Sequence, residues 1–413
     1  MNVKITPSQL SGKIKAPASK SFAHRIIISA FLSGEKCTID GVGNSKDVLA
    51  TISALRDMGA NSSLNDGVCE IERVNRKNSQ KINCIESGST LRFLIPVACA
   101  LGLECEFTGQ GRLLERPIKE LTDVLNENGG KIVGHKIAGK LRSGEYKINA
   151  TVSSQFISGL MFALPILDGD SKIVLLGNAV SKGYLDITIE VLSKFNIKIE
   201  KTEYGYNISG NQKYVLPKEI KVEGDFSGAA FLLCSGAISN SITVSGLNAN
   251  STQGDAKILD VLIKFGAKVS CEKDEITITA NGLKGIEYDC EDIPDLVQII
   301  SVVASFSKGK TVLKNVERLR IKESDRVKAI IDMLTIAGIK VENIDSDLII
   351  YGGKVNGGEF DGGNDHRTVM SSAILSLYAS GSSKIVGAQV VDKSYPEFFS
   401  DLIKLGGKVD VDI

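Results

Sequence analysis

The chain has 413 residues, and its 49 lysines and arginines are balanced by 49 aspartates and glutamates. Aromatic residues make up only 6% and tryptophan is absent. Nucleic-acid-binding surfaces normally carry a basic excess, and single strands stack on aromatic side chains, so the composition argues against a nucleic-acid partner. The length predicts two or three domains, each with its own core.

The chain shows no sign of a membrane or metal partner. Its first residues, MNVKITPSQL, lack the basic and apolar segments of a signal peptide, and the longest apolar run, FLIPVACALGL, is about half of a membrane span. Eight cysteines are scattered without CxxC spacing or histidine partners. We therefore expect a cytoplasmic protein with reduced, mostly buried thiols, no metal site and no membrane contact.

A repeat of about 70 residues runs through the whole chain. In each copy a leucine is followed four residues later by glycine or asparagine, and then usually by lysine and a β-branched residue. This pattern is typical of an amphipathic helix that ends in a glycine C-cap and leads into a strand. The glycine or asparagine stands at positions 59, 129, 196, 266, 338 and 406.

Six apolar helices are predicted between these copies. They open with serine or aspartate near positions 19, 87, 153, 225, 295 and 365. Because they are apolar on nearly every side, we expect them to be buried, with the opening serine or aspartate as N-cap. Short strands follow them, for example KCTIDGV, SKIVLLGN, NSITVSGL and GKTVLKNV.

The predicted unit is therefore β-α-β-α-β-β, repeated six times. Buried helices must pack on one another, so the units should group in threes around helical cores with the sheets outside. This predicts two similar α/β domains. Six repeats that close into a ring would instead form a structural clamp, which is the alternative without catalysis.

Polar residues concentrate where the apolar helices begin. Ser21 and Arg25 lie four residues apart, on one side of the first helix, and the third helix opens with Ser153, Ser154 and Gln155. Helix N-termini present free N–H groups and the positive end of the dipole, so they are natural anion sites. Helices that point the same way within a domain would gather these residues on one face.

Several of these residues also have ordinary interpretations. Asp295 is equally typical of a plain N-cap, and Lys322, Glu323 and Arg326 more often form a solvated helix face. His366 would by default make a polar contact at a helix start. Function is favoured because these residues fall at corresponding positions of several repeats.

Cations outnumber acids among the singled-out residues, which suits a site for two small polyanions. No nucleotide-binding glycine motif, Ser-His-Asp arrangement or metal cluster is visible. The cations are Lys20, Arg25, Arg116, Lys322, Arg326, Arg367 and Lys393, and the only expected acids are Asp295 and Glu323.

Nine motifs across the whole chain resemble the 5-enolpyruvylshikimate-3-phosphate (EPSP) synthase family, in that family's order and approximate spacing. The resemblance implies a two-domain α/β prism, or inside-out α/β barrel, of six βαβαββ repeats, three in each domain. It implies one domain of residues 1–19 plus 223–413 (repeats 4–6), a second of residues 20–222 (repeats 1–3), and an active site in the cleft between them. The motifs are APASKSFAHR, ESGSTLRFLIP, GRLLERPI, SSQF, VSKGYLDIT, EGDFSGAA, RIKESDR, NDHR and DKSYPEFF.

The resemblance also implies a reaction: transfer of the enolpyruvyl group of phosphoenolpyruvate to the 5-hydroxyl of shikimate 3-phosphate, in the shikimate pathway to chorismate and aromatic amino acids, without metal or cofactor. Asp295 would accept the hydroxyl proton and Glu323 would protonate the methylene carbon, with Lys20 as a further catalytic residue. The implied shikimate 3-phosphate ligands are Lys20, Ser21, Arg25, Ser153, Ser154, Gln155, Ser181, Tyr184, Asp295 and Lys322. The implied phosphoenolpyruvate ligands are Lys20, Gly88, Arg116, Gln155, Arg326, Arg367 and Lys393.

The related UDP-N-acetylglucosamine enolpyruvyl transferase family is the enzymatic alternative. That family typically has a Lys-Asn pair near the start and a cysteine in a flexible loop, whereas here the pair is Lys20-Ser21 and the loop GQGRLLERPI has no cysteine. The resemblance further implies a monomer, domain closure at hinges before Lys20 and near 222–225, and inhibition by glyphosate. The sequence departs from the family pattern at Glu86, Ser89, Gly183 and Arg318.

Overall fold

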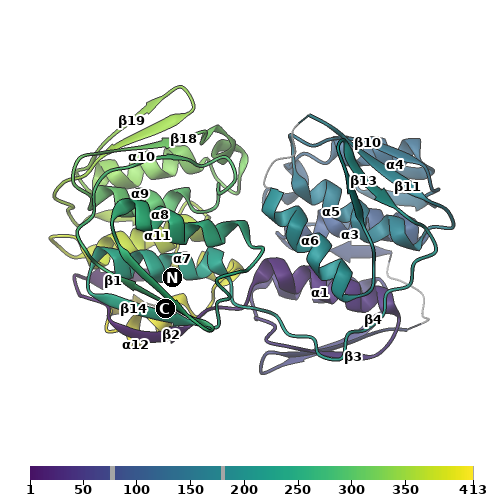
Figure 1. The fold of residues 1–413 in the computed structure, drawn as a ribbon, viewed down its shortest axis with the longest axis horizontal. Coiled ribbons are helices and arrows are strands. Elements are labelled where there is room, and N and C mark those ends of the chain that lie inside the picture. Colours follow the sequence, from purple (N-terminus) through teal and green to yellow (C-terminus); the bar gives the residue numbers. More distant parts are fainter. Residues whose placement is uncertain (75–79, 178–181, 413) are drawn as a thin grey trace. The chain divides into compact units, whose positions relative to one another are not determined.

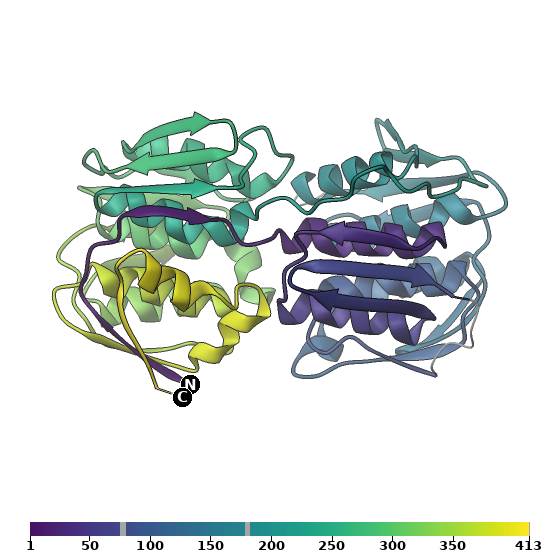
Figure 2. The same cartoon turned by 90° about the horizontal axis from the view of Figure 1, so that it is seen from below.

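The structure is a computed structural model that describes residues 1–74, 80–177 and 182–412. Its contacts divide the chain into two compact units. Unit 1 comprises Met1–Ser19 and Glu223–Ile413, and unit 2 comprises Lys20–Val222. In each unit, sheets surround a group of helices (Figures 1 and 2). The fold is therefore a two-domain α/β fold.

Unit 2 contains three sheets, each connected by one buried and one amphipathic helix. The buried helices are α1 (Lys20–Ser33), α3 (Gly88–Ala100) and α5 (Ser154–Ala163), and the amphipathic ones are α2 (Lys46–Asp57), α4 (Lys119–Glu127) and α6 (Lys182–Lys194). The strands of the first sheet lie in the order β3 (Cys37–Asp40), β5 (Val68–Arg73), β4 (Ala60–Asn65). Those of the second lie in the order β6 (Lys81–Asn83), β7 (Cys105–Thr108), β9 (Lys136–Gly139), β8 (Gly130–Val133). Those of the third lie in the order β10 (Glu145–Asn149), β11 (Ser171–Leu176), β13 (Gly205–Ile208), β12 (Glu200–Thr202).

Unit 1 follows the same plan. Its buried helices are α7 (Phe226–Ile238), α9 (Val297–Ser305) and α11 (His366–Leu377), and its amphipathic ones are α8 (Ile258–Phe265), α10 (Arg326–Ile336) and α12 (Phe398–Lys404). In spatial order, one sheet consists of β15 (Lys268–Glu272), β16 (Glu275–Thr279), β14 (Ser241–Ser245) and β2 (Gly12–Lys15). The next consists of β17 (Glu287–Asp289), β18 (Lys310–Lys314), β20 (Asp347–Tyr351) and β19 (Lys340–Ile344). The last consists of β21 (Glu359–Asp361), β22 (Ser383–Val386), β1 (Asn2–Thr6) and β23 (Lys408–Asp412).

The N-terminal strands complete sheets of unit 1. Strand β1 pairs antiparallel with β22 and β23, and β2 pairs parallel with β14. The first sheet of unit 2 has three named strands, and Lys221 forms a parallel bridge to Asp40 at its edge. The edge is closed by hydrogen bonds from Asp40 N to the Ile220 carbonyl (2.9 Å) and from Val222 N to the Asp40 carbonyl (2.8 Å). In unit 1, the N-terminal strands β1 and β2 thus occupy places in two sheets whose other strands come from the second half of the chain.

The predicted C-caps are confirmed in every repeat. The first or second residue after each amphipathic helix adopts a left-handed backbone, which glycine and asparagine tolerate best. The φ angles are 106° at Gly59, 98° at Gly129, 61° at Asn196, 106° at Gly266, 77° at Gly338 and 98° at Gly406.

Four of the predicted N-caps are confirmed, and one is wrong. Ser87, Ser153, Asp225 and Asp365 each accept a hydrogen bond from a backbone N–H in the first turn of their helix. Helix α9 instead begins at Val297, and its cap makes no side-chain hydrogen bond. Asp295 is therefore not an N-cap, and its carboxylate is available for other contacts.

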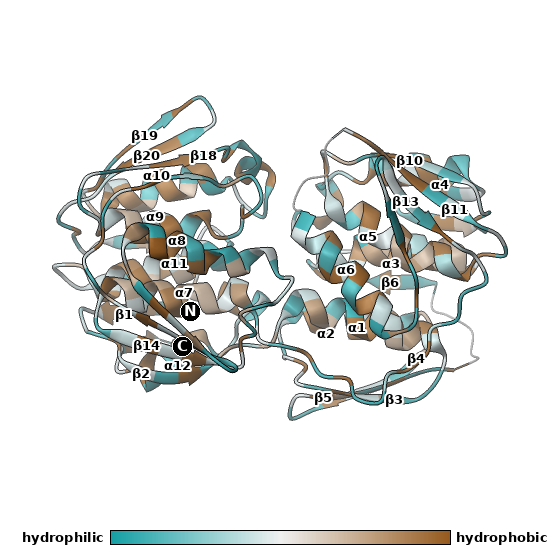
Figure 3. Cartoon of the chain, viewed as in Figure 1, coloured by the Kyte–Doolittle hydropathy of each residue, from teal (hydrophilic) through white to brown (hydrophobic). Residues whose placement is uncertain are grey.

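The cores lie between the buried helices. In unit 1, α7, α9 and α11 all contact one another, and in unit 2 α5 contacts both α3 and α6. Gly159 allows α5 to approach α3 closely, because a Cβ there would lie 2.5 Å from the Arg92 carbonyl oxygen. Apolar colour fills much of α5 and α9, whereas α6 shows both polar and apolar faces (Figure 3). Among the described residues, no helix is both long and apolar enough to cross a bilayer.

Candidate active site

In unit 1, a single buried guanidinium binds three carboxylates. Arg326 is the first residue of α10 and is only 1% exposed. Its Nη1 lies 2.7 Å from Asp295 Oδ1, its Nη2 lies 2.9 Å from Glu323 Oε2, and its Nε donates to Asp365 Oδ2 at 2.7 Å. The interpretation of Lys322, Glu323 and Arg326 as a solvated helix face is therefore wrong.

These carboxylates keep the Arg326 guanidinium charged. Burial lowers the pKa of Arg326, but Asp365, Glu323 and Asp295 outweigh burial and raise the pKa above the ordinary value. Burial likewise raises the pKa of Asp365, and the nearby Arg326 and His366 outweigh it, so the net pKa is lowered. The cluster is thus a buried ionic network, whose members compensate one another's desolvation.

Asp295 is the centre of a second set of contacts. Its Oδ1 lies 3.5 Å from Lys322 Nζ and 3.6 Å from Arg367 Nε, and its backbone carbonyl accepts a hydrogen bond from Arg367 Nη1 at 2.9 Å. Burial lowers the pKa of the Lys322 ammonium, an effect that Asp295 opposes. With Arg326, three cations therefore lie around one carboxylate oxygen of Asp295.

The expectation of only two acids beside the cations is wrong. Asp365, predicted only as an N-cap, also binds Arg326, and Asp47 Oδ2 lies 2.9 Å from Lys20 Nζ. Asp255, which is 6% exposed, lies near both Asp295 and Arg367. The cation excess of the site is therefore smaller than the sequence indicates.

Two further residues, Arg318 and His366, border this cluster, and Lys393 lies on a neighbouring element. Arg318 lies in the 3-10 helix η4 (Glu317–Ile321), and its Nη1 is buried without a hydrogen-bond partner among the described residues. Burial lowers the pKa of Arg318, and Asp295 opposes this effect. Lys393 ends the 3-10 helix η5 (Ala388–Lys393), which packs on α11. The His366 ring is buried, with Nδ1 3.8 Å from Asp365 Oδ1.

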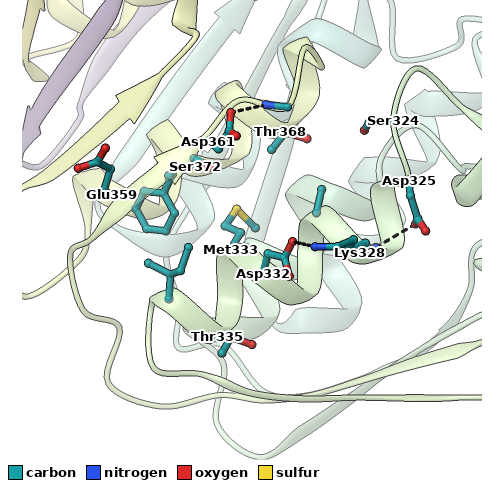
Figure 4. Close-up of a pocket in the computed structure, with 14 residues that line it drawn as sticks. Ser324, Asp325, Lys328, Asp332, Met333, Thr335, Glu359, Asp361, Thr368 and Ser372 are labelled. Atoms are coloured by element: carbon teal, nitrogen blue, oxygen red, sulfur yellow. Dashed lines mark hydrogen bonds and ion pairs between the residues drawn. The ribbon is translucent and has the colours of Figure 1, made fainter. Parts of the chain in front are cut away.

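A pocket of about 550 Å³ between α10, β21 and α11 adjoins the cluster without containing it (Figure 4). Ser324 lines the pocket and donates a hydrogen bond to Asp365 Oδ2 (3.0 Å). Its acids already have partners, since Asp332 pairs with Lys328 and Asp361 accepts a hydrogen bond from the Gly363 N–H. We therefore assign the chemistry to the ionic cluster. Across the described parts of the chain, no group of three His, Cys, Asp or Glu side chains could hold a metal ion.

In unit 2, Arg25 is buried among neutral oxygens. It is 2% exposed, and its three guanidinium nitrogens donate to Thr188 Oγ1 (2.8 Å) and to the carbonyls of Ser21 (2.8 Å) and Tyr184 (3.0 Å). Burial lowers the pKa of Arg25 to about 9. A bound anion would relieve this cost, because an opposite charge stabilises the protonated form.

Gln155 is held by residues of α3. Its Oε1 accepts a hydrogen bond from Arg92 Nη1 (2.7 Å), and its Nε2 donates to Ser89 Oγ (2.9 Å). The Ser153 hydroxyl accepts a hydrogen bond from the Gln155 N–H, which places Gln155 in the first turn of α5. Both amide atoms of Gln155 are thereby oriented, and Ser89, a departure from the family pattern, supplies one of the two contacts.

Gly88, at the start of α3, faces the Arg116 guanidinium. A Cβ on Gly88 would lie 2.7 Å from Arg116 Nη1, so a side chain there would displace the guanidinium. The neighbouring Glu86 lies against Gly111 of the following loop, where a Cβ would be 2.6 Å from Glu86 Oε1. Arg116 and the N-terminus of α3 thus form a compact cationic corner.

The N-terminus of α1 is joined to its neighbours by polar contacts. Lys20 pairs with Asp47 of α2, and His24 Nδ1 lies 2.6 Å from Thr51 Oγ1 of the same helix. Burial, Lys20 and Arg25 hold the pKa of His24 well below its ordinary value, so this imidazole is neutral. Of the expected site residues, Ser181 lies outside the described residues; Ser154 is buried at the start of α5.

The structure therefore groups the expected residues within each unit. Asp295, Lys322, Glu323, Arg326 and Arg367 are brought together in unit 1. Arg25, Ser21 and Tyr184 meet in unit 2, as do Gly88 and Arg116. Sequence reasoning missed Arg92, Asp47 and Asp255. Arg92 carried a signal, because a charged residue inside an apolar helix needs a buried partner.

The chain is similar to known proteins over nearly its whole length. A family model described as EPSP synthase (3-phosphoshikimate 1-carboxyvinyltransferase) matches residues 5–402. The chain is 42% identical over 421 residues to a 3-phosphoshikimate 1-carboxyvinyltransferase of Clostridium acetobutylicum, covering 98% of both chains. It is 39% identical over 430 residues to that of Clostridium novyi, covering 99% of this chain and 98% of the relative.

Solved structures show the same fold. An EPSP synthase from Acinetobacter baumannii superposes with a TM-score of 0.87 at 25% identity, covering 100% of both chains. The enolpyruvyl transferase NikO from Streptomyces tendae, at 15% identity and a TM-score of 0.80, shares the fold. With a family model over nearly the whole length and relatives at about 40% identity, the chain belongs to the EPSP synthase (3-phosphoshikimate 1-carboxyvinyltransferase) family.

Proposed function

We propose that the ionic cluster of unit 1 and the cationic residues of unit 2 act on the same pair of substrates in the family's reaction. That reaction moves the enolpyruvyl group of phosphoenolpyruvate to the 5-hydroxyl of shikimate 3-phosphate and releases phosphate. It needs a base for the hydroxyl, an acid for the methylene carbon and cations for the anionic groups. The proposal therefore uses residues of both units for one pair of substrates.

One observation carries the assignment of the base and the acid. Asp295 and Glu323 bind the same guanidinium, at 2.7 Å and 2.9 Å, so one residue holds both carboxylates within reach of one reacting centre. Asp295 Oδ1 lies within 3.6 Å of Lys322, Arg326 and Arg367, whose charges compensate that of the carboxylate. We assign Asp295 as the base.

Glu323 must carry a proton to act as the acid. In the free protein, Glu323 Oε2 lies 2.9 Å from Arg326 Nη2. Phosphoenolpyruvate brings a carboxylate and a phosphate of its own, which would compete with Glu323 for this guanidinium. We propose that Glu323, released from Arg326 in this way, carries the proton that it gives to the methylene carbon.

The remaining residues bind the anionic groups. Arg25 is proposed to bind the shikimate phosphate, because its buried guanidinium donates hydrogen bonds to three neutral oxygens. Gln155 lies where Arg92 and Ser89 fix its amide, beside the sugar-like ring. The proposed shikimate 3-phosphate ligands further include Lys20, Ser21, Ser153, Ser154, Ser181, Tyr184, Asp295 and Lys322, and phosphoenolpyruvate would bind Lys20, Gly88, Arg116, Gln155, Arg326, Arg367 and Lys393.

Phosphate release tests the reaction. The purified protein should release phosphate from phosphoenolpyruvate only when shikimate 3-phosphate is present. Release that depends on UDP-N-acetylglucosamine instead would contradict the assignment and favour the sibling reaction. Absence of release with either acceptor would refute enolpyruvyl transfer.

Isosteric substitutions test the two roles. Asp295→Asn and Glu323→Gln should each lower kcat by at least about 100-fold, the range expected for loss of a general base or acid. The exposed acids Asp292 and Glu317, which pair with Lys257 and Arg320, provide the matched controls Asp292→Asn and Glu317→Gln. Turnover near that of the controls would refute the assigned roles.

We further propose that the protein acts as a monomer in the cytoplasm. All eight cysteines are free and seven of them are buried, in keeping with a reducing compartment. Light scattering on a sizing column should give the mass of one chain. A stable dimer at micromolar concentration would contradict the monomer.

A further inference from the structure

A chain of buried hydrogen bonds joins three helices of unit 2. His24 Nδ1 of α1 lies 2.6 Å from Thr51 Oγ1 of α2, which in turn lies 2.6 Å from Thr90 Oγ1 of α3. The Thr90 hydroxyl donates to Ser87 Oγ at 2.7 Å. His24 is 1% exposed and the other three residues are 0% exposed, so water cannot replace these bonds. The proposed reaction uses none of the four side chains.

The number of protons available gives this chain a direction. The Thr90 hydroxyl has one proton, which it donates to Ser87, so it accepts from Thr51. Thr51 therefore gives its single proton to Thr90 and accepts from His24 Nδ1. His24 is thus the Nδ1–H tautomer. Burial keeps the pKa of His24 well below its ordinary value, so Nε2, which has no hydrogen-bond partner among the described residues, carries no proton.

The chain ends at the residue that caps α3. Ser87 Oγ accepts both the Thr90 hydroxyl and the Thr90 backbone N–H (3.3 Å), and these two bonds fix the cap. Gly88 follows directly as the first residue of α3, and a Cβ there would lie 2.7 Å from Arg116 Nη1. Because the fit between Gly88 and Arg116 is so close, a small displacement of this turn changes their contact.

Helix α2 also holds the N-terminus of α1. Asp47 Oδ2 of α2 lies 2.9 Å from Lys20 Nζ of α1. Asp47 and Thr51 are four residues apart, as are Lys20 and His24, so each pair lies on one side of its helix. Two contacts, Lys20 with Asp47 and His24 with Thr51, therefore join α1 to α2. Since Thr51 continues to Thr90, α2 connects the first turns of α1 and α3.

We propose that Thr51 is a positioning residue for phosphoenolpyruvate binding, which through Thr90 fixes the first turn of α3 relative to that of α1. The inference rests on the proposed function, in which Lys20, Gly88 and Arg116 bind phosphoenolpyruvate. The hydrogen-bonded chain sets the geometry of binding residues and contains neither the assigned acid nor the assigned base. Its loss should therefore act mainly on the KM for phosphoenolpyruvate and less on kcat.

Substitution of the two threonines in the full-length protein tests this role. Thr51→Val removes the hydroxyl but keeps the branched shape, and it should raise the KM for phosphoenolpyruvate by about fivefold, within the range for one buried hydrogen bond. Thr90→Val should have a similar effect, and the double variant should be no worse than the larger single effect, because both substitutions break one chain. Thr51→Ser keeps the hydroxyl and should retain the KM of wild type.

Nitrogen NMR of the imidazoles gives a readout that does not depend on activity. The chemical shifts of the two ring nitrogens report which of them carries the proton, and the chain has only three histidines. Signals that persist in both His135→Gln and His366→Gln belong to His24, and they should show the Nδ1–H tautomer at neutral pH. The Nε2–H tautomer would overturn the proposal, because Thr51 would then donate to His24 and have no proton for Thr90.

Two further variants separate failure of the inference from failure of the proposed function. Thr311→Val removes a fully buried hydroxyl of β18 that has no hydrogen-bond partner among the described residues, and it should leave KM unchanged. Arg116→Gln should raise the KM for phosphoenolpyruvate at least as much as Thr51→Val.

The positioning role is refuted if Arg116→Gln raises KM but Thr51→Val, shown to be folded by circular dichroism, does not. It is also refuted if the effects of Thr51→Val and Thr90→Val multiply in the double variant. If Thr51→Val does not fold, the KM of Thr90→Val and the His24 tautomer of wild type decide by the same criteria. If Arg116→Gln itself leaves KM unchanged, the proposed ligand role of Arg116 fails instead.

Discussion

Two buried arginines show opposite solutions to the cost of burying charge. Arg326 contacts three carboxylates within the protein, so its charge is compensated before any substrate binds. The Arg25 guanidinium donates hydrogen bonds to three neutral oxygens, and burial lowers its pKa. An anionic substrate is therefore stabilised more by binding to Arg25. At Arg326, the substrate must compete with the carboxylates of the protein.

The pKa of Asp255 predicts a pH-dependent stability. Burial and Asp295 raise this pKa to about 6, whereas the unfolded chain has the ordinary value near 3.8. The folded state therefore resists ionisation, and the cost of Asp255 grows as pH rises from about 4 to about 6 and is constant above. Asp255→Asn should gain stability relative to wild type across this window, by up to about 3 kcal/mol.

Thermal unfolding between pH 4.5 and 7.5 measures this difference. The exposed Asp410→Asn variant serves as the control, with a midpoint that follows wild type at every pH. A midpoint difference between Asp255→Asn and wild type that does not change with pH would contradict the raised pKa.

The site could be read from the sequence only in part, for a physical reason. Glu323, Arg326 and Arg367 were singled out because they occur at corresponding positions of the repeat. Asp255 does not occur at a corresponding position of the repeat, and the charged residues near it, Asp295 and Arg367, come from distant parts of the chain. Partner choice among buried polar groups is set by tertiary packing, and that information is not local in the chain.

At the scale of elements, the repeat predicted where the amphipathic helices end, because the left-handed turn at a helix end restricts the residue type. Five of the six C-cap positions have glycine, and the sixth has Asn196 at φ 61°. The sheet that a strand joins, in contrast, could not be predicted from the repeat. Nothing in the residues of β1 shows that it pairs with β22 and β23, more than 370 positions away; only the family resemblance indicated the crossover.

Asn196 offers a test of this C-cap argument. Alanine at a left-handed position costs roughly 1–2 kcal/mol, whereas glycine adopts the position without strain. Asn196→Ala should therefore lower the free energy of unfolding by about 1 kcal/mol, and Asn196→Gly should not. Urea unfolding followed by circular dichroism compares the two, and equal midpoints for both variants would contradict the argument.

The contact between the start of α3 and Arg116 predicts an effect on binding. A methyl group at Gly88 would lie 2.7 Å from Arg116 Nη1, so the flexible guanidinium must move away. Gly88→Ala should raise the KM for phosphoenolpyruvate by about tenfold, through loss of one charged hydrogen bond, with a smaller effect on kcat. Steady-state kinetics at saturating shikimate 3-phosphate measures both parameters.

Gly381 provides the control for this substitution. A Cβ at Gly381 meets nothing within 4 Å, so Gly381→Ala should behave as wild type. If Gly88→Ala leaves KM at the level of Gly381→Ala, Arg116 does not bind phosphoenolpyruvate in the proposed way.

At the scale of the whole molecule, the groups that one reaction needs are divided between two units. The proposed acid and base belong to unit 1, and Arg25, Gln155 and Arg116 belong to unit 2. The chain passes between the units at two junctions, after Ser19 and after Val222. Both junctions are fixed on the unit 1 side, since Ser19 N donates to the Glu223 carbonyl (2.8 Å) and Gln253 binds Glu223 and Gly224.

This division predicts that substrates bring the units together. Under the proposed function, residues of both units contact the same two small molecules, so bound substrates should hold the units together, and two covalent junctions are compatible with a hinge motion. In small-angle X-ray scattering, the radius of gyration of the Asp295→Asn variant, which binds without turnover, should decrease when both substrates are added. Phosphoenolpyruvate alone should have less effect, because its proposed ligands in unit 2 lack the Arg25 contact. Arg25→Ala in the same background should reduce the change at equal substrate concentrations. An unchanged radius with both substrates bound would show that the two units do not close on one site.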